Sequence, residues 1–168
     1  MCDSKMYKIG DLYECNGKQG VVFEVTEDRK HGKIVSLIDS KELLLWSSDS
    51  AEQRTFIGTN STYNGAKNMD IATKIPNWRV KYPAFAWCET LGDGWYLPSI
   101  EELQTIFNNS ILINPLLTDC LDGSYWSSTE SEEVFEGVTC VWRLLMMDGS
   151  ISSDDKVAGN YVRAIAIF

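Results

Sequence analysis

Residues 94–103 read Gly-Trp-Tyr-Leu-Pro-Ser-Ile-Glu-Glu-Leu. The segment predicts a short strand that turns at Pro98 into a helix, because proline disfavours continuation of either element but is tolerated beside a helix start. Ser99 and Glu102 have the spacing of a capping box, in which each side chain accepts a hydrogen bond from the backbone of the first turn. Apolar residues follow at helical spacing, namely Ile100, Leu103, Ile106 and Phe107. We expect this helix to end at Asn108 and Asn109.

Two further helices are expected upstream of this segment. Asn64 can cap a helix over residues 65–74, which Pro76 would stop. A second helix is predicted from Tyr82 or Pro83 to about Leu91, since proline suits a first helical turn and Gly92 lies just past the last periodic residue. The polar segment before Asn64, residues 47–64, is interpreted as a loop.

The N-terminal part of the chain has the pattern of strands. Residues 20–25 and 33–37 are rich in β-branched side chains and flank a polar segment, which is typical of a hairpin with a longer loop. Residues 10–14 predict an earlier short strand, and Asn16 with Gly17 predicts a tight turn.

The last quarter of the chain is also predicted to be sheet. Aromatic residues begin a strand at residues 125–129, and residues 138–147 form a long strand pattern closed by the turn signal Asp148-Gly149. Residues 161–168 are apolar on both faces except for Arg163, which predicts a central strand.

These elements predict a single α+β domain over residues 1–168. Within it we expect an N-terminal β-hairpin region at 7–40, a helical region at 65–110 and a C-terminal sheet at 124–168. A chain of this length can bury a core without a disulfide or a metal.

The charge of the chain disfavours nucleic-acid partners. It has 15 lysine and arginine residues against 24 aspartate and glutamate residues, a net charge of −9, with no basic stripe. Such a surface repels phosphate backbones in general. No segment approaches the ~20 consecutive apolar residues of a transmembrane helix, and no pattern of a signal peptide is visible.

The cysteines suggest neither zinc nor thioredoxin-type chemistry, because no Cys-x-x-Cys pair occurs among them. They are Cys2, Cys15, Cys88, Cys120 and Cys140. Cys120 and Cys140 are either a disulfide within the sheet or two buried thiols. A mature bacterial lipoprotein begins at a lipidated cysteine, so Cys2 is a candidate lipid anchor, which would place the domain at the cell surface.

No catalytic constellation is visible in the sequence. The single histidine, His31, lies in the predicted hairpin loop, away from any nucleophile, and one imidazole cannot form a histidine-rich zinc site. The adjacent pairs Glu101-Glu102 and Glu132-Glu133 do not have the facing geometry of glycosidase carboxylates. The acidic residues of the last loops do not match a calcium-binding loop; they are Asp148, Asp154 and Asp155. We therefore expect no metal and no cofactor.

The tryptophans leave two interpretations open. Trp78, Trp87 and Trp95 lie beside predicted helices and are expected in the core. Trp126 and Trp142 lie on C-terminal strands, where an indole either packs in the core or stacks on a sugar ring or a partner side chain.

Three segments together carry a resemblance to a known family. Residues 94–103, Tyr-Trp-Ser-Ser-Thr at 125–129 and Tyr-Val-Arg-Ala at 161–164 resemble bacterial C-type-lectin-like domains of the formylglycine-generating-enzyme subgroup. The resemblance is to the Lcl C-terminal type (domain-of-unknown-function family 1566), with a similar ending in the variable proteins of diversity-generating retroelements. It covers roughly residues 7–168.

The resemblance implies a C-type-lectin-like fold, with two to three helices packed against twisted antiparallel sheets. It implies that the C-terminal strands and loops bind the ligand, and that Pro98, Glu102 and Arg163 belong to the scaffold. The ligand-binding residues it implies are Ser127, Ser128, Glu130, Trp142, Arg143, Asp148, Ser150 and Asn160. The calcium-binding strings of animal lectins are missing, and Cys140 lacks the second cysteine of the sulfatase-activating enzymes.

The sequence therefore predicts a non-enzymatic recognition module that binds a protein or a glycan, at the cell surface or secreted. Two alternatives remain at this stage. One is an enzyme of the same fold that uses Cys140 or Cys120, and the other is a structural subunit of a surface assembly. The sequence leaves the oligomeric state open.

Overall fold

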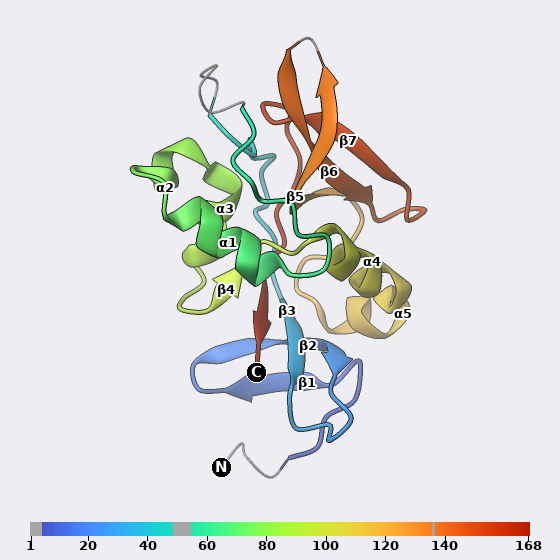
Figure 1. Cartoon of the computed structure of the whole chain (residues 1–168). Coiled ribbons are helices and arrows are strands. Elements are labelled where there is room, and N and C mark those ends of the chain that lie inside the picture. The colour runs from blue at the N-terminus through green and yellow to red at the C-terminus, as the bar shows by residue number, and fades with distance from the viewer. Residues whose placement is uncertain (1–4, 49–54, 136) are drawn as a thin grey trace.

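The computed structural model of the chain describes residues 5–48, 55–135 and 137–168 (Figure 1). It contains two antiparallel sheets, of five strands in the order β1-β2-β3-β8-β4 and of three strands in the order β5-β6-β7. Helices pack around both sheets. This is the predicted α+β architecture.

The five-stranded sheet joins the start of the chain to its end. Its strands are β1 (Leu12–Cys15), β2 (Lys18–Val25), β3 (Gly32–Ser36), β4 (Trp95–Tyr96) and β8 (Ile165–Ile167). The tight turn after β1 is confirmed: Asn16 and Gly17 have φ values of 52° and 76°, as a two-residue hairpin turn of the primed type requires. The loop between β2 and β3 contains His31, which is exposed as predicted.

The three-stranded sheet is made of β5 (Ser124–Phe135), β6 (Val138–Leu145) and β7 (Ile151–Asp155). The prediction of one C-terminal sheet over residues 124–168 is wrong, because β8 pairs with β3 and β4 instead. Only residues 165–167 of the predicted strand 161–168 form it. A segment that is apolar on both faces is stable only where both faces are covered, and the interior position between β3 and β4 provides that for Ile165 and Ala166.

The three predicted helices are confirmed. The helices are α1 (Gly65–Thr73), α2 (Trp78–Lys81), α3 (Pro83–Glu89), α4 (Ile100–Asn108) and α5 (Ser110–Ile113), followed by the 3-10 helix η1 (Asn114–Leu116). The Asn64 side chain accepts from the backbone N–H of Lys67 at 2.9 Å, and Ser99 and Glu102 form the capping box. The additional helices α2, α5 and η1 are single turns, too short to produce a periodic pattern.

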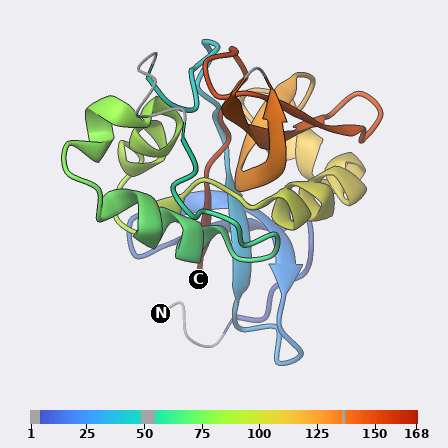
Figure 2. The same cartoon turned by 45° about the horizontal axis from the view of Figure 1, so that its top comes forward.

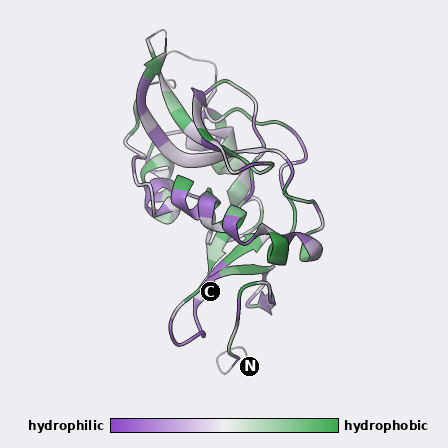
Figure 3. Ribbon diagram, turned by 90° about the vertical axis from the view of Figure 1, so that its right-hand side faces the viewer, coloured by the Kyte–Doolittle hydropathy of each residue, from purple (hydrophilic) through white to green (hydrophobic). Residues whose placement is uncertain are grey.

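The layers are visible in two views. Helices α1, α2 and α3 lie on one side of the molecule and α4 and α5 on the other, with β3 and β8 running between them and the β5–β7 sheet at one end (Figures 1 and 2). Hydrophobic and hydrophilic residues alternate along α4 (Figure 3), which buries Ile100, Leu103 and Ile106. Two apolar clusters make up the core, one around Trp46, Phe85 and Trp126, the other around Phe23, Leu103 and Tyr125.

Glu102 does more than cap α4. Its Oε2 accepts from the backbone N–H of Ser99 at 2.8 Å and of Gly65 at 3.0 Å, so one carboxylate holds the first turns of both α4 and α1. Its Oε1 lies 3.1 Å from the Lys33 ammonium and accepts from the Tyr96 hydroxyl at 3.2 Å. The buried Glu102 therefore links two helices to the five-stranded sheet, as expected of a scaffold residue.

Arg163 has a comparable role at the other edge of the core. Its guanidinium donates to the carbonyls of Ser36 at 3.0 Å and Asp119 at 2.6 Å, and to the Asp39 carboxylate at 3.3 Å. The Tyr125 hydroxyl donates to the same carboxylate at 2.9 Å. Arg163 is fully buried, so these contacts replace the water that the charge loses on folding.

The buried tyrosines give a testable pH dependence. Burial raises the pKa of the Tyr96 phenol, and the Glu102 carboxylate shifts it in the same direction. Burial also raises the pKa of Tyr125, which Arg163 partly opposes. Because the folded-state pKa values lie above the unfolded ones, the neutral phenols contribute stability that is present below about pH 10 and is lost as the pH rises towards the folded-state values.

We therefore expect the Tyr96→Phe variant to retain the full rise in tyrosinate absorbance that the folded wild-type protein shows near pH 10. The measurement is an absorbance titration of both proteins, with circular dichroism recorded at each pH. A smaller rise in the variant near pH 10, while both proteins remain folded, would contradict the expectation.

Candidate functional site

A hollow of 550 Å³ lies where the segment before α1 meets strands β5 and β6. We call it the outer groove. It is lined by Phe56, Asn60, Thr62, Glu130, Ser131, Glu132, Glu133 and Trp142. Phe56 is 45% exposed and Trp142 is half-buried, so two aromatic side chains lie among carboxylate, amide and hydroxyl groups.

A second hollow of the same volume adjoins the outer groove through the shared residue Glu133. Its lining is Glu133, Val134, Cys140, Ser153, Asp154 and Asp155. The Ser153 hydroxyl donates to the Glu133 carboxylate, which fixes the side chain between the two hollows. The lining of both hollows is acidic, and none of the described residues in it is basic.

The rim of the outer groove is held in place by the Glu130 carboxylate. Its oxygens accept backbone N–H groups from three consecutive residues, Ile57 at 3.0 Å, Gly58 at 2.8 Å and Thr59 at 2.9 Å. The backbone N–H of Glu130 in turn donates to the Thr59 carbonyl at 2.8 Å. A charged acceptor that binds several backbone donors fixes the path of the segment strongly.

Lys156 supplies the counter-charge. Its ammonium forms an ion pair with Glu130, donates to the Thr55 carbonyl at 2.7 Å and lies 4.7 Å from the centre of the Trp46 ring. Both side chains of the pair are fully buried. Burial lowers the pKa of Lys156, and the adjacent Glu130 carboxylate opposes that shift. Glu130 thus contributes to the lining of the groove while Lys156 balances its charge.

Four of the residues expected on the binding face are buried, which corrects their predicted placement at the surface. The Ser127 hydroxyl donates to the Trp142 carbonyl at 2.6 Å, and the Ser128 hydroxyl accepts from Asn68 at 2.9 Å. Asn160 lies beneath the surface and its backbone pairs with Leu44. These small polar groups and Glu130 bond to neighbouring backbone and side chains instead of facing solvent.

The other four predicted residues do not form one site. Trp142 lines the outer groove, whereas the next residue, Arg143, points to the opposite face, as alternation along a strand requires. Arg143 pairs with Asp154 at 3.1 Å and donates to Ser124 at 2.8 Å. Asp148 and Ser150 lie in the turn between β6 and β7, where Asp148 accepts from the Ser150 backbone at 2.9 Å.

Sequence reasoning missed most of the groove lining. Phe56, Asn60 and Thr62 come from the segment interpreted only as a polar loop, and an aromatic residue within such a segment was the available signal. From the sequence, Glu132 and Glu133 are considered only as glycosidase carboxylates, whereas they belong to strand β5 and line the groove. Trp126 is fully buried, and its indole N–H donates to the Leu44 carbonyl at 2.8 Å. The interpretation that Trp126 packs in the core is therefore confirmed.

Two predictions on the cysteines have different outcomes. Cys120 and Cys140 are thiols, so the disulfide interpretation is wrong; Cys140 is buried as the other interpretation expects, whereas Cys120 is exposed. The predicted lipid anchor, Cys2, lies outside the described residues. No helix in the described part of the chain has the length and apolar composition needed to cross a membrane.

The capped helix α4, the start of strand β5 and the buried Arg163 lie in the three segments that carry the family resemblance. The model of the Lcl C-terminal domain matches residues 36–166. The chain belongs to the Lcl C-terminal domain family. This is a C-type-lectin-like family, so the resemblance is confirmed at that level. No curated protein is detectably similar to the chain.

The matched part of this Lcl C-terminal domain contains all the helices and the β5–β7 sheet, and therefore the whole outer groove. Strands β1 and β2 lie before it. The groove is thus part of the family domain, while the N-terminal hairpin extends the five-stranded sheet beyond it.

The Glu130–Lys156 pair predicts a large stability difference between two neighbouring glutamates. Glu130→Gln leaves a buried ammonium without a counter-ion, and breaking such a pair typically costs about 3–5 kcal/mol. Glu132→Gln changes the same charge at an exposed position of the groove and should alter the free energy of unfolding by about 0.5 kcal/mol or less. Urea denaturation of both variants measures the difference, and equal stabilities would contradict the assigned role of Glu130.

Proposed function

We propose that this Lcl C-terminal domain is a non-enzymatic recognition module that binds a glycan in the outer groove. The observation that carries the proposal is the pairing of two accessible aromatic side chains, Trp142 and Phe56, with polar groups in one hollow. Concave sites with an apolar surface and a few polar groups are the usual form of small-ligand sites.

The chemistry of the lining suits a sugar. An aromatic ring offers a flat apolar face to the C–H groups of a pyranose, while its position in the strand keeps it rigid. The Asn60 amide both donates and accepts, and the Thr62 hydroxyl and Glu133 carboxylate add further partners for sugar hydroxyls. The same groups bind poorly to a purely apolar ligand, since their own hydrogen bonds with water would be lost.

The charge of the region narrows the class of glycan. Glu132 and Glu133 line the groove, and Asp155 lines the adjoining hollow together with Asp154, whose charge Arg143 balances. Their negative potential opposes sulfated or carboxylated sugars. Neutral sugars and sugars that carry an amine are the favoured ligands.

The rim of the outer groove is rigid, so that a ligand can bind with little loss of conformational entropy. Glu130 fixes residues 57–59 by three hydrogen bonds, and Asn68 holds the Ser61 backbone at both its N–H, at 3.0 Å, and its carbonyl, at 2.8 Å. A site that is preformed loses less entropy when the ligand binds. The buried motif residues thus support the proposed site by holding its rim.

The side chains of the outer groove also favour ligand binding over catalysis. Among the described residues, the lining of the outer groove contains no histidine, cysteine, lysine or arginine. Its carboxylates do not form the facing pair of a glycosidase, because Glu132 and Glu133 are neighbours on β5 and Glu130 is held by Lys156. The kinship with formylglycine-generating enzymes is proposed at the level of the fold alone, because Cys140 is buried and is not paired with Cys120.

We expect the Trp142→Ala and Phe56→Ala variants to lose at least about tenfold in affinity for a neutral glycan identified on an array, a loss of roughly 1.4 kcal/mol. Tyr63→Ala is the matched control, since Tyr63 is a 65% exposed aromatic residue outside the groove. Calorimetry on the folded variants and the wild type measures these affinities. Equal binding by Trp142→Ala and wild type would contradict the proposal. If the same variants instead lost binding to a protein, the groove would be a protein-binding site and the glycan assignment would be wrong.

A further inference from the structure

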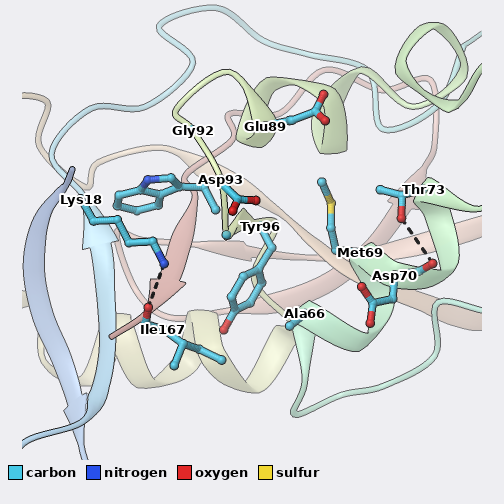
Figure 4. A pocket seen from close by; sticks show the side chains of 12 residues that line it. Lys18, Ala66, Met69, Asp70, Thr73, Glu89, Gly92, Asp93, Tyr96 and Ile167 are labelled. Carbon is cyan, nitrogen blue, oxygen red and sulfur yellow. Dashed lines mark hydrogen bonds between the residues drawn. The ribbon is translucent and has the colours of Figure 1, made fainter. Parts of the chain in front are cut away.

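A separate cleft of 420 Å³ lies between α1, the turn after α3 and the ends of β2 and β8 (Figure 4). We call it the hairpin cleft. It is lined by Lys18, Ala66, Met69, Asp70, Thr73, Glu89, Gly92, Asp93, Gly94, Trp95, Tyr96 and Ile167. It shares no residue with the outer groove.

The hairpin cleft has an apolar floor that is held by the core. Trp95 and Tyr96 are 5% and 4% exposed, and the half-buried Met69 packs against both apolar clusters. The Tyr96 hydroxyl is directed to Glu102 beneath the cleft, which leaves its ring beside the cavity. The volume falls within the roughly 300–1,000 Å³ of small-molecule sites.

The side chains that line the cleft carry more negative than positive charge. Among the described residues, neither Asp70 nor Asp93 makes an ion pair, whereas Glu89 is already held by Arg79 through both carboxylate oxygens. The one cation of the lining, Lys18, donates to the Ile167 carbonyl at 3.1 Å. Figure 4 shows Asp93 between Lys18 on one side and Met69 and Asp70 of α1 on the other.

The glycine turn gives the cleft its shape. Gly92 and Gly94 have φ values of 115° and 78°, a region that side-chain-bearing residues rarely adopt. A Cβ atom at Gly94 would lie 2.8 Å from the Lys18 Nζ. The glycine therefore lets the Lys18 side chain cross the turn and reach the end of β8.

From this geometry we propose that the hairpin cleft binds a small organic cation, an amine or guanidine on an apolar stem. The stem packs against Met69 and the Tyr96 ring, and the cationic group is attracted by Asp70 and Asp93. An aromatic face beside carboxylates suits an organic cation more than an anion, since both the ring quadrupole and the carboxylates favour positive charge.

The hairpin cleft is completed by parts of the chain that the family model does not match. Lys18 precedes the matched residues 36–166 and Ile167 follows them. The proposed site thus depends on the N-terminal hairpin and the last strand, and it is independent of the glycan proposal.

The test uses phenethylamine as probe, with 3-phenylpropionate as an anion of similar shape and Nα-acetyl-lysine N-methylamide as a side-chain mimic. We expect calorimetry or nuclear magnetic resonance titration of the whole protein to show binding of the cations and at least about tenfold weaker binding of the anion. Stronger binding of phenethylamine would identify a free amine as the natural source, and stronger binding of the lysine derivative would identify a side chain of a partner.

The double variant Asp70→Asn/Asp93→Asn should weaken cation binding at least about tenfold. The matched control Glu27→Gln/Asp122→Asn makes the same change in net charge at exposed positions outside the cleft. Its affinity for the cation should stay within about twofold of that of the wild type. Trp142→Ala should have no effect, which separates this result from the glycan test. The absence of binding by both cations, equal binding of the anion, or equal losses in the two double variants would overturn the proposal.

Discussion

The fold around the outer groove depends on one buried carboxylate. Glu130 lies inside the protein with its charge balanced by Lys156 and its oxygens bonded to three successive backbone N–H groups. A buried charge that lost these partners would be strongly unfavourable, so the chain around it has little freedom. The segment from Thr55 to Thr59, which has no regular secondary structure, is therefore held against strand β5 as firmly as a strand would be.

The same physical device recurs at two other places. Glu102 binds the first turns of α1 and α4 and pairs with Lys33. Arg163 binds the carbonyl at the end of β3, the carbonyl of Asp119 and the Asp39 carboxylate. Each charge joins segments that are far apart in sequence. The exposed hollows lie between segments fixed in this way, which leaves their surface side chains free to differ while the frame stays unchanged.

The two proposed sites differ in how they depend on this frame. The outer groove lies entirely within the region that defines the family, next to the Glu130 pair. The hairpin cleft needs the hairpin residue Lys18 and the strand residue Ile167, which extend the frame at its other end. Both are acidic, in keeping with the net charge of −9, and both therefore favour neutral or positively charged ligands over phosphate or sulfate.

Local sequence determined the helices and the tight turns, because caps, prolines, glycines and apolar periodicity act within a few residues. These elements are the capped helix α4, the helices after Asn64 and at Pro83, the first hairpin and the turn at Gly149. It did not determine that β8 joins β3, nor that Ser128 and Glu130 point inwards, because pairing and burial depend on segments distant in sequence. The family resemblance implies that the polar side chains after Trp126 belong to the binding face, but they are buried. Only the tertiary structure supplies the backbone N–H groups and the Lys156 ammonium that make their burial stable.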